Sequence, residues 1–449
     1  MSLKKLALRG TLWTLIGYGA SQLIRFGGNV ILTRFLAPEL FGLIATVMTL
    51  INAFNLLSDL GLAPSVVQNR RGDDPIFLNT VWTIQMIRGV ILWFGCLLIS
   101  WPIAQFYDEP SLLLLMPILG LTCLLNGFNS TSFFTLTRQV ALKELTFLEL
   151  KVQIFSLAII LVWIGFSPTI WALVGGNVAG AALKMALSHR IIPKYFNRLA
   201  WEPEAARDIL SFGKWIFIST AFMFLATQTD RLILAKLISF KIVGIYTIAY
   251  SLAVLPQLAI GRLSGQVFLP VFSKLTELSR DSFRLKLLNN RRWLLLAMIC
   301  LVLPLVCFGD WFISLIYDAR YQQAAWMLPI LALGIWPNIL VETNRQALVA
   351  LGKLNYQAYG QIFKSIHMCL GLLIGFHFFG LPGFIIMVAL NDLESYVIVS
   401  YGLWREKLSC LRQDLIITTL FISAIALTLM VRELSGLGLP IDLMFASTP

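Results

Sequence analysis

Long apolar runs recur along the whole chain, separated by short polar stretches or by stretches with glycine and proline. Each run holds about 20 residues, the length that a helix needs to cross a hydrocarbon layer of about 30 Å. The pattern predicts about thirteen membrane-spanning helices. They cover residues 11–36, 40–62, 80–106, 112–136, 145–166, 169–189, 210–236, 242–270, 292–316, 324–350, 357–379, 382–404 and 414–432.

The connections between these helices are short. The two longest are expected at 190–208 and 271–291, and neither can hold a soluble domain. Any chemistry must therefore take place among the helices, which leaves conduction, transport or intramembrane catalysis. Composition agrees with a membrane protein, because 58% of the residues are hydrophobic and only 13% are charged. Soluble domains carry about a quarter charged residues.

The net charge of +12 is best explained by topology. With the N-terminus inside, most lysines and arginines fall on inner connections, and cytoplasmic loops of membrane proteins carry this excess. The charge distribution predicts a cytoplasmic N-terminus, and the odd number of spans places the C-terminus outside. The outer side holds only Arg34, Lys236, Lys241, Arg320 and Arg432.

An internal repeat divides the chain. The segment Asn29-Val-Ile-Leu-Thr-Arg34 is similar to Arg231-Leu-Ile-Leu-Ala-Lys236, and in the same alignment Gly42 falls on Gly244. Chance similarity between apolar helices is an alternative. An even number of spans separates the copies, which is typical of parallel repeats with a site between two bundles. We therefore predict an all-α polytopic membrane protein with two pseudo-repeated six-helix bundles around a central cavity. The predicted lobes are 1–205 and 206–405, with an additional C-terminal span and tail at 406–449.

Polar residues within the spans are the candidate functional groups. An ionisable side chain at bilayer depth costs about 2.5–3.5 kcal/mol, so it usually faces a cavity or a partner. In the first span, Tyr18, Gln22, Arg25 and Asn29 have spacings that place them on one helical face. Arg25 lies near mid-depth, and we expect it to face a cavity; a structural pair with another helix is the alternative.

The next three spans carry further polar groups. Asp59 begins a segment that ends at Pro64 and predicts a helix break, with either a gating or a capping role. Arg88, with Gln85, lies about two turns inside the third span, where function and snorkelling explain it equally well. The fourth span contains Asn126 in a polar and aromatic stripe that suits either sugar hydroxyls or helix–helix contacts. This stripe consists of Thr122, Asn126, Asn129, Ser130 and Phe133.

The second half repeats the pattern. Arg231 lies in the seventh span, and Arg262 lies in the eighth, which should bend at Pro256. In the tenth span Arg345 either faces the cavity or pairs with Glu342, three residues before it. The twelfth span holds Asp392 and Glu394. Residues two apart point about 200° apart on a helix, so at most one of these acids can serve as an ion or proton site.

Five arginines thus lie within spans: Arg25, Arg88, Arg231, Arg262 and Arg345. If all faced lipid, the cost would be about 12–17 kcal/mol, so a wet, cationic interior is the cheaper arrangement. Guanidinium groups bind phosphates and carboxylates, which indicates an anionic cargo such as a diphosphate.

We expect no metal and no cofactor. The six cysteines form no CxxC pair, and the three histidines are scattered. The sequence contains no phosphate loop, hydrolase elbow or zinc motif.

Several segments resemble the bacterial polysaccharide exporters, the colanic-acid and O-antigen type flippases of the multidrug/oligosaccharidyl-lipid/polysaccharide superfamily. The first half contributes Phe41-Gly42-Leu and Leu57-Ser-Asp59-Leu-Gly61-Leu-Ala-Pro-Ser-Val-Val-Gln68. The second contributes Asp230-Arg-Leu-Ile-Leu-Ala-Lys236, Val243-Gly244-Ile-Tyr246, Ala249-Tyr250 and Phe268-Leu-Pro270-Val-Phe272-Ser-Lys274. The resemblance reaches to about residue 405. The family usually has twelve or fourteen spans, so thirteen departs from its pattern.

This resemblance implies an inner-membrane protein that flips an undecaprenyl-diphosphate-linked oligosaccharide to the periplasmic leaflet by alternating access. We expect the protein to be a monomer. Its partners would be the lipid-linked glycan, membrane lipids, and the glycan polymerase and glycosyltransferases of the same pathway, without nucleic acid. The predicted cavity residues are Arg25, Gln22, Asn29, Arg88, Arg231, Arg262, Arg345 and Asn126, and the predicted ion or proton sites are Asp59, Asp392 and Glu394. A cation-coupled multidrug exporter and a membrane-embedded glycan polymerase or ligase are the alternatives.

Overall fold

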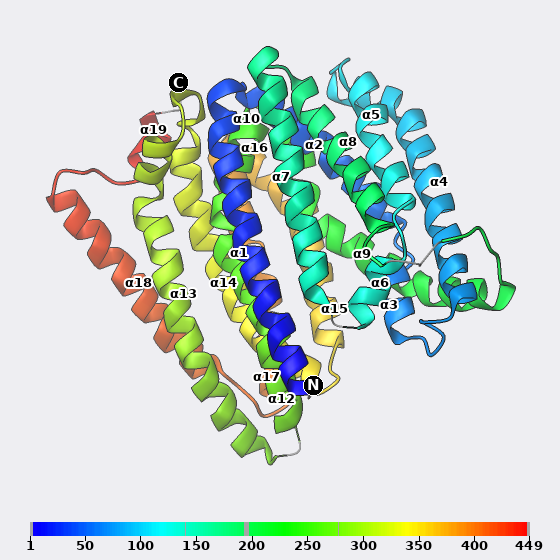
Figure 1. Cartoon of the computed structure of the whole chain (residues 1–449). Coiled ribbons are helices and arrows are strands. Elements are labelled where there is room, and N and C mark those ends of the chain that lie inside the picture. Colours follow the sequence, from blue (N-terminus) through cyan, green and yellow to red (C-terminus); the bar gives the residue numbers. More distant parts are fainter. Residues whose placement is uncertain (1–2, 140, 193–196, 277, 447–449) are drawn as a thin grey trace. The chain divides into compact units, whose positions relative to one another are not determined.

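The computed structural model describes residues 3–139, 141–192, 197–276 and 278–446, which form helices joined by turns and short connections (Figure 1). The helices group into two compact units. The first consists of Met1–Phe224 and Ala235–Phe240, and the second of Leu225–Leu234 and Lys241–Pro449. The predicted lobe boundaries at 205 and 405 remain predictions.

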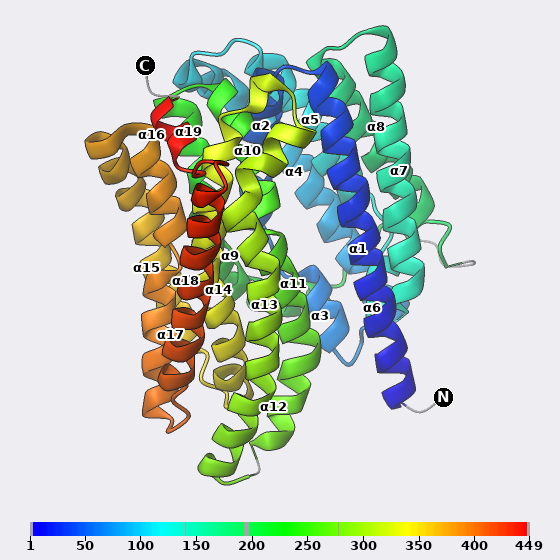
Figure 2. The same ribbon diagram turned by 90° about the vertical axis from the view of Figure 1, so that its left-hand side faces the viewer.

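The first unit packs helices in pairs. α4 lies against α5, α7 against α8, and α1 against α7 (Figure 2). Prolines at the first turns of α2 and α4 favour those starts, because the N–H that proline lacks would be unsatisfied there anyway. Its helices are α1 (Leu3–Phe35), α2 (Pro38–Leu57), α3 (Leu62–Gln68), α4 (Pro75–Tyr107), α5 (Leu112–Gly127), α6 (Ser132–Arg138), α7 (Leu142–Phe166), α8 (Ile170–Ser188) and most of α9 (Pro203–Leu237).

The second unit is built around α14, whose apolar stretch of 18 residues is 78% buried. α13 and α18 lie side by side at the outside of this unit. The elements are α10 (Phe240–Ala253), α11 (Leu255–Leu263), π-helix η1 (Ser264–Phe268), α12 (Leu269–Leu275), α13 (Arg280–Ile316), 3-10 helix η2 (Ala319–Tyr321), α14 (Ala324–Ala350), α15 (Asn355–Ile366), π-helix η3 (His367–Gly371), α16 (Leu372–Leu390), α17 (Leu393–Arg405), α18 (Leu411–Leu434) and α19 (Asp442–Ala446).

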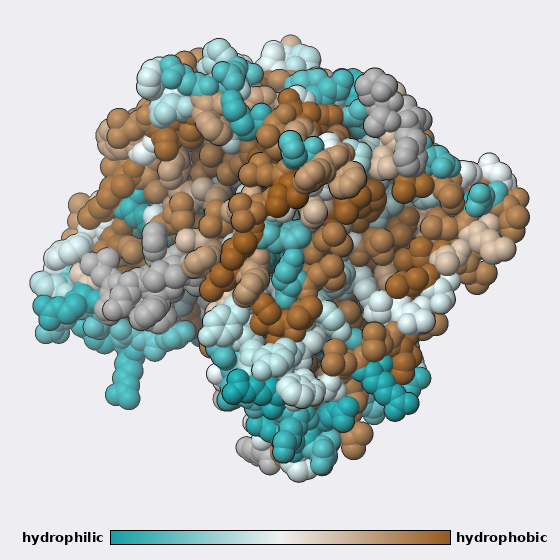
Figure 3. Space-filling model, turned by 180° about the vertical axis from the view of Figure 1, so that it is seen from behind, coloured by the Kyte–Doolittle hydropathy of each residue, from teal (hydrophilic) through white to brown (hydrophobic). Residues whose placement is uncertain are grey.

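Many large apolar side chains point outward from the helices, as expected where lipid is the solvent. Figure 3 shows hydrophobic residues over much of one face, with hydrophilic residues along its upper and lower edges. Within the described residues, 8 helices are long and apolar enough to cross a membrane, or up to 10 if each bent pair is one span.

This number is smaller than the thirteen predicted. α1 is long enough, but Gln22, Arg25 and Asn29 interrupt its apolar stretch. In addition, Asn355–Arg405 counts once although the chain leaves helical geometry at Gly380.

The repeat is visible in the helix ends. α1 ends at Phe35 and α2 begins at Pro38, while α9 ends at Leu237 and α10 begins at Phe240. These two turns occupy equivalent places beside the similar segments 29–34 and 231–236. The second copy therefore repeats the turn as well as the residues, as the parallel repeat predicts.

The predicted helix breaks are present. Gly61 has a φ of 63°, a left-handed conformation that glycine adopts without strain, and it separates α2 from α3. α10 and α11 meet at 41° beside Pro256. A further bend, of 59° between α5 and α6, was not predicted. The predicted connection at 271–291 is wrong in part, because α12 continues to Leu275 and α13 already begins at Arg280.

Candidate functional site

A polar cavity of about 610 Å³ lies within the first unit, among α1, α2, α5, α7 and α8. Arg25 and Asn29 of α1 line it, as does Asn126 at the end of α5. Of the predicted residues, the cavity therefore brings together three. Its other polar lining residues are Asn52, Asn55, Thr122, Glu149, Gln153, Ser156, Asn177 and Lys184.

Arg25 is exposed to this cavity, and no carboxylate among the described residues lies within ion-pair distance of it. Lys184 also lacks a carboxylate partner within the described part of the chain; its ammonium lies 5.5 Å from the centroid of the Phe133 ring. With Glu149 on the wall, the cavity carries two cations and one anion. Its excess charge is positive.

Sequence reasoning missed Lys184 and Glu149. Both are charged residues within predicted spans, at 169–189 and 145–166. The argument applied to Arg25, that a charge at bilayer depth usually faces a cavity, applies equally to them.

The orientation of Arg25 follows from the packing of α1 on α7. One turn before it, the Ser21 hydroxyl donates to Gln153 Oε1 at 2.7 Å, and Gln153 Nε2 donates to the Ser21 carbonyl at 2.9 Å. This reciprocal pair holds the two helices together. Gln22 does not line the cavity, because its Nε2 donates to the Tyr18 hydroxyl at 2.6 Å. The predicted stripe on α1 therefore contributes Arg25 and Asn29 only.

A smaller pocket of about 220 Å³ adjoins the cavity and shares Asn55 and Asn126 with it. Arg88 lines this pocket. Its Nε donates to Ser58 Oγ at 2.9 Å and its NH2 group to the Asn55 carbonyl at 2.6 Å. Arg88 thus caps the C-terminal end of α2, where carbonyls lack helical partners and a cation is favourable. Snorkelling does not explain Arg88, since its head binds protein groups.

Two neighbours of Arg88 have similar roles. Asp59 Oδ1 accepts from the Gly61 N–H at 2.9 Å, which stabilises the turn before α3. Gln85 Nε2 donates to the carbonyls of Asn126, Gly127 and Asn129, where α5 ends. The capping alternative for Asp59 therefore has a geometric basis, while its predicted role in ion coupling is untested.

The polar stripe of the predicted fourth span is split by the bend between α5 and α6. Thr122 and Asn126 line the cavity, whereas Asn129 and Ser130 are buried in the bend. The Ser130 N–H donates to Ser188 Oγ at 2.9 Å, which is a helix–helix contact. One continuous face was expected because the prediction assumed one straight helix.

In the second unit, the charged groups around Arg231 and Asp392 are paired or packed. The guanidinium carbon of Arg231 lies 5.5 Å from the centroid of the Tyr250 ring, a cation–π contact, and its NH1 group donates to Gln228 at 3.1 Å. Next to it, the Tyr246 hydroxyl donates to Asp230. A cavity of only about 40 Å³ lies between Thr227, Tyr250, Lys364 and Asp392, among others.

Asp392 and Glu394 each have a basic partner. Lys364 Nζ lies 2.7 Å from Asp392 Oδ1, and His367 Nδ1 lies 2.6 Å from Glu394 Oε1. The expectation that the two acids point apart assumed one continuous helix. This assumption is wrong, because α16 ends at Leu390 and α17 begins only at Leu393. Because of this turn, the two acids reach Lys364 and His367, which lie three residues apart on neighbouring segments of the chain.

The remaining predicted arginines do not reach the cavity of the first unit. Arg345 pairs with Glu342 at 2.6 Å, so this arginine follows the second alternative, a pair within its own helix. Arg262 is exposed on α11 and lines neither cavity described above. Among the described residues, no group of three His, Cys, Asp or Glu side chains could hold a metal ion.

The cavity of the first unit thus offers cations, amides and hydroxyls around an open volume. Amides and hydroxyls can exchange hydrogen bonds with sugar hydroxyls, and guanidinium or ammonium groups bind phosphates. The arrangement suits a polar, anionic molecule with many hydroxyl groups.

Comparisons with known proteins identify the family. A model of the polysaccharide biosynthesis protein family matches residues 31–326, more than half of the chain. The lipopolysaccharide biosynthesis protein WzxC of Escherichia coli (strain K12) is 21% identical over 423 residues, covering 89% of this chain and 82% of that protein.

Solved structures share the fold. The lipid II flippase MurJ in an inward closed conformation superposes with a TM-score of 0.73 at 16% identity, covering 94% of this chain and 92% of that chain. An inward-facing multidrug resistance transporter of the MATE family gives a TM-score of 0.63 at 13% identity, covering 90% and 95%.

These findings agree with the resemblance noted in the sequence and with a transporter family rather than an enzyme family. The chain is a multi-pass membrane protein that belongs to the polysaccharide biosynthesis protein family.

Proposed function

We propose that this protein flips an undecaprenyl-diphosphate-linked oligosaccharide or polysaccharide precursor from the cytoplasmic to the periplasmic leaflet of the inner membrane. The observation that carries the proposal is the polar cavity of the first unit, with Arg25 and Lys184 lacking carboxylate partners among the described residues. Membership of a polysaccharide biosynthesis family supports a glycan cargo.

The cavity has the size of a small-ligand site, about 300–1,000 Å³ in general. A lipid-linked glycan needs only its polar part enclosed, since the lipid tail can remain in the bilayer. In the proposed mechanism, Arg25 and Lys184 bind the diphosphate, while Asn29, Asn52 and Asn126 accept or donate hydrogen bonds to the first sugars. The cations are worth more here than in water, because the surroundings have a low dielectric constant.

Access alternates between the two sides of the membrane in this proposal. The breaks at Gly61 and Pro256 are the proposed flexing points, because at each of them a helix already ends or bends. We place the N-terminus in the cytoplasm, on the basis of the distribution of lysines and arginines between the connections.

The test uses purified protein in vesicles that contain a fluorescent polyprenyl-diphosphate-linked oligosaccharide. Its transfer between leaflets is followed by the loss of accessible label. Arg25→Ala and Lys184→Ala should each slow the transfer by about 10- to 100-fold, since a charge-assisted hydrogen bond contributes about 1.5–3 kcal/mol. Arg190→Ala, an exposed arginine just beyond α8, is the matched control and should transfer lipid at the wild-type rate.

Wild-type transfer by Arg25→Ala and Lys184→Ala would remove the cavity from the mechanism. Extrusion of cationic dyes without lipid transfer would favour a multidrug exporter instead. Formation of longer glycans by the purified protein would favour a polymerase or ligase.

A further inference from the structure

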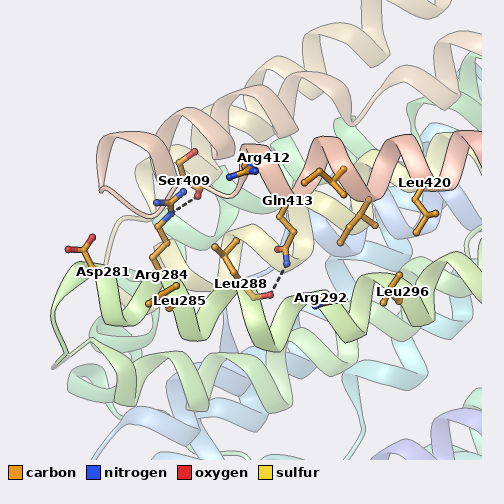
Figure 4. A pocket seen from close by; sticks show the side chains of 12 residues that line it. Asp281, Arg284, Leu285, Leu288, Arg292, Leu296, Ser409, Arg412, Gln413 and Leu420 are labelled. Carbon is orange, nitrogen blue, oxygen red and sulfur yellow. Dashed lines mark hydrogen bonds between the residues drawn. The ribbon is translucent and has the colours of Figure 1, made fainter.

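A second cavity, of about 630 Å³, lies in the second unit between α13 and α18 (Figure 4). It differs in kind from the polar cavity of the first unit. Toward one end, Arg284 and Arg292 on α13 and Arg412 on α18 surround Leu288, and the rest is lined by aliphatic side chains such as Leu296, Ile416 and Leu420. We call this cavity the α13–α18 groove. A cationic end joined to an apolar channel matches a molecule with an anionic head and hydrocarbon chains.

The spacing of the lining residues explains this composition. Arg284, Leu288, Arg292 and Leu296 follow each other every four residues on α13, so they share one helical face. Arg412, Ile416 and Leu420 do the same on α18. From Arg284 to Leu296 the groove extends for about 18 Å along the helix axis.

The three arginines have no acidic partner among the described residues, and the guanidinium of Arg292 lies 5.6 Å from the centroid of the Trp293 ring. All three are exposed. Arg284 makes one protein contact, from its Nε to the Ser409 carbonyl at 2.9 Å, which leaves the rest of its guanidinium free to bind. Asp281 also lines the groove and subtracts one charge, so the cationic end carries a net charge of two.

A buried network holds the walls of the groove together. Arg291 and Asp414, with side chains only 1% and 2% exposed, form an ion pair at 2.6 Å between α13 and α18. Gln413 faces the groove, donates to the Leu288 carbonyl at 2.7 Å and accepts from Arg291 at 3.2 Å (Figure 4). The groove is therefore preformed, which lowers the entropy cost of binding.

The position of the groove selects its occupant. Both α13 and α18 are candidate membrane spans, so the aliphatic part of the groove lies where hydrocarbon chains are the solvent. Arg284 and Arg412 lie near the starts of their helices, and Arg292 lies directly before the long apolar run of α13, toward the level of lipid headgroups. Basic pockets between helix ends at this level bind the phosphates of anionic lipids.

We propose that the α13–α18 groove binds an anionic phospholipid, with its phosphate among Arg284, Arg292 and Arg412 and an acyl chain along Leu296, Ile416 and Leu420. The lipid is a bound component of the second unit and not the transported cargo. This inference is independent of the proposed function, because binding can be measured without transport.

The test measures lipid binding to the full-length protein in detergent by native mass spectrometry. Phosphatidylglycerol should bind and be retained, whereas zwitterionic phosphatidylcholine should not. The double variant Arg292→Gln/Arg412→Gln removes two cations that take part in no ion pair among the described residues, so its fold should be intact. Each lost arginine should weaken phosphatidylglycerol binding about fivefold, by the usual contribution of a basic residue near an anionic headgroup.

The matched control is Arg207→Gln/Arg405→Gln, which removes two exposed arginines that do not line the groove. It should bind phosphatidylglycerol as the wild type does. Equal binding of both phospholipids, or an equal loss in both double variants, would overturn the proposal. So would displacement of the lipid by excess inorganic phosphate, or stronger binding of a polyprenyl diphosphate, which would make the groove a cargo site.

Discussion

The two units of the chain treat charges at bilayer depth in opposite ways. In the first unit, Arg25 and Lys184 lie beside an open cavity of about 610 Å³ and have no carboxylate partner among the described residues. In the second, Lys364 and Asp392 are buried against each other, beside a cavity of about 40 Å³. A desolvated charge must be compensated by water, a ligand or an opposite charge.

This difference separates groups that bind from groups that hold the fold. A cation that is compensated by an opposite charge within the protein has little capacity left for a phosphate. A cation beside open volume keeps that capacity. The comparison therefore assigns the proposed cargo contacts to the first unit, and assigns mainly structural roles to the ion pairs of the second.

The largest expected effect on stability is that of Asp392→Ala. This change leaves the Lys364 ammonium buried without its partner, with only 8% of its side chain exposed. Removing one partner of a buried pair costs about 3–5 kcal/mol, so the thermal midpoint in detergent should fall strongly. The double variant Lys364→Met/Asp392→Leu should recover most of the loss, since it removes both charges. An unchanged midpoint in Asp392→Ala would break the contrast between the units.

Arg88→Met in the first unit should have the next largest effect. The variant loses the two hydrogen bonds that cap the end of α2, at Ser58 and Asn55. Hydrogen bonds to a charged group contribute about 1.5–3 kcal/mol to the free energy of unfolding. Thermal unfolding measures the loss, with exposed Arg70→Met as the control. If both variants unfold alike, Arg88 is not a structural cap and belongs with the binding residues.

Asp74→Asn should have a smaller effect that depends on pH. Asp74 caps α4, and the Arg71 guanidinium beside it, together with the Ile76 N–H, lowers the pKa of this carboxyl. A lowered pKa means that the folded state favours the carboxylate. Its stabilisation is therefore present above the unfolded-state pKa and is lost as the pH falls through the folded-state pKa.

The group is at the protein surface, where solvent screens the pair, so the effect should be well below that of Arg88→Met. Thermal midpoints of wild type and Asp74→Asn should differ near neutral pH and converge below about pH 4, the ordinary range of an aspartate. A constant difference across this range would mean that the ion pair does not contribute.

The smallest effect on stability should come from Arg25→Ala, although its effect on transport is expected to be large. Arg25 has no ion-pair partner among the described residues, so its loss leaves no acid unpaired. Replacing a residue of this kind usually changes stability by less than about 0.5 kcal/mol. Thermal unfolding and lipid transfer measured on the same preparation would test this. A strong loss of stability would show that Arg25 is structural, and the contrast between the two units would fail.

Much of the fold follows from the sequence, because helix length in a membrane is set by the thickness of the hydrocarbon layer. The predicted spans 324–350 and 414–432 lie within α14 and α18, and the predicted breaks at Gly61 and Pro256 are present. The bend between α5 and α6 was not predicted, since no proline marks it. It changed which members of the polar stripe share a face.

The candidate site was predictable to a smaller extent. Charge within an apolar run identified Arg25, and the same signal was available for Lys184 and Glu149. The sequence alone did not decide whether Arg25 and Arg345 face a cavity or a partner, although it showed Glu342 as a possible partner of Arg345. Whether a carboxylate lies within reach depends on the neighbouring groups, as Glu342 shows for Arg345.

The sequence by itself determined that this is a helical membrane protein with a repeated turn, because apolar length and residue similarity are properties of the chain alone. Only the tertiary structure decided which charges are compensated by partners and which face open volume. That outcome depends on contacts such as Ser21 with Gln153 and Lys364 with Asp392, which join distant parts of the sequence. The energy of a buried charge is set by what surrounds it in space.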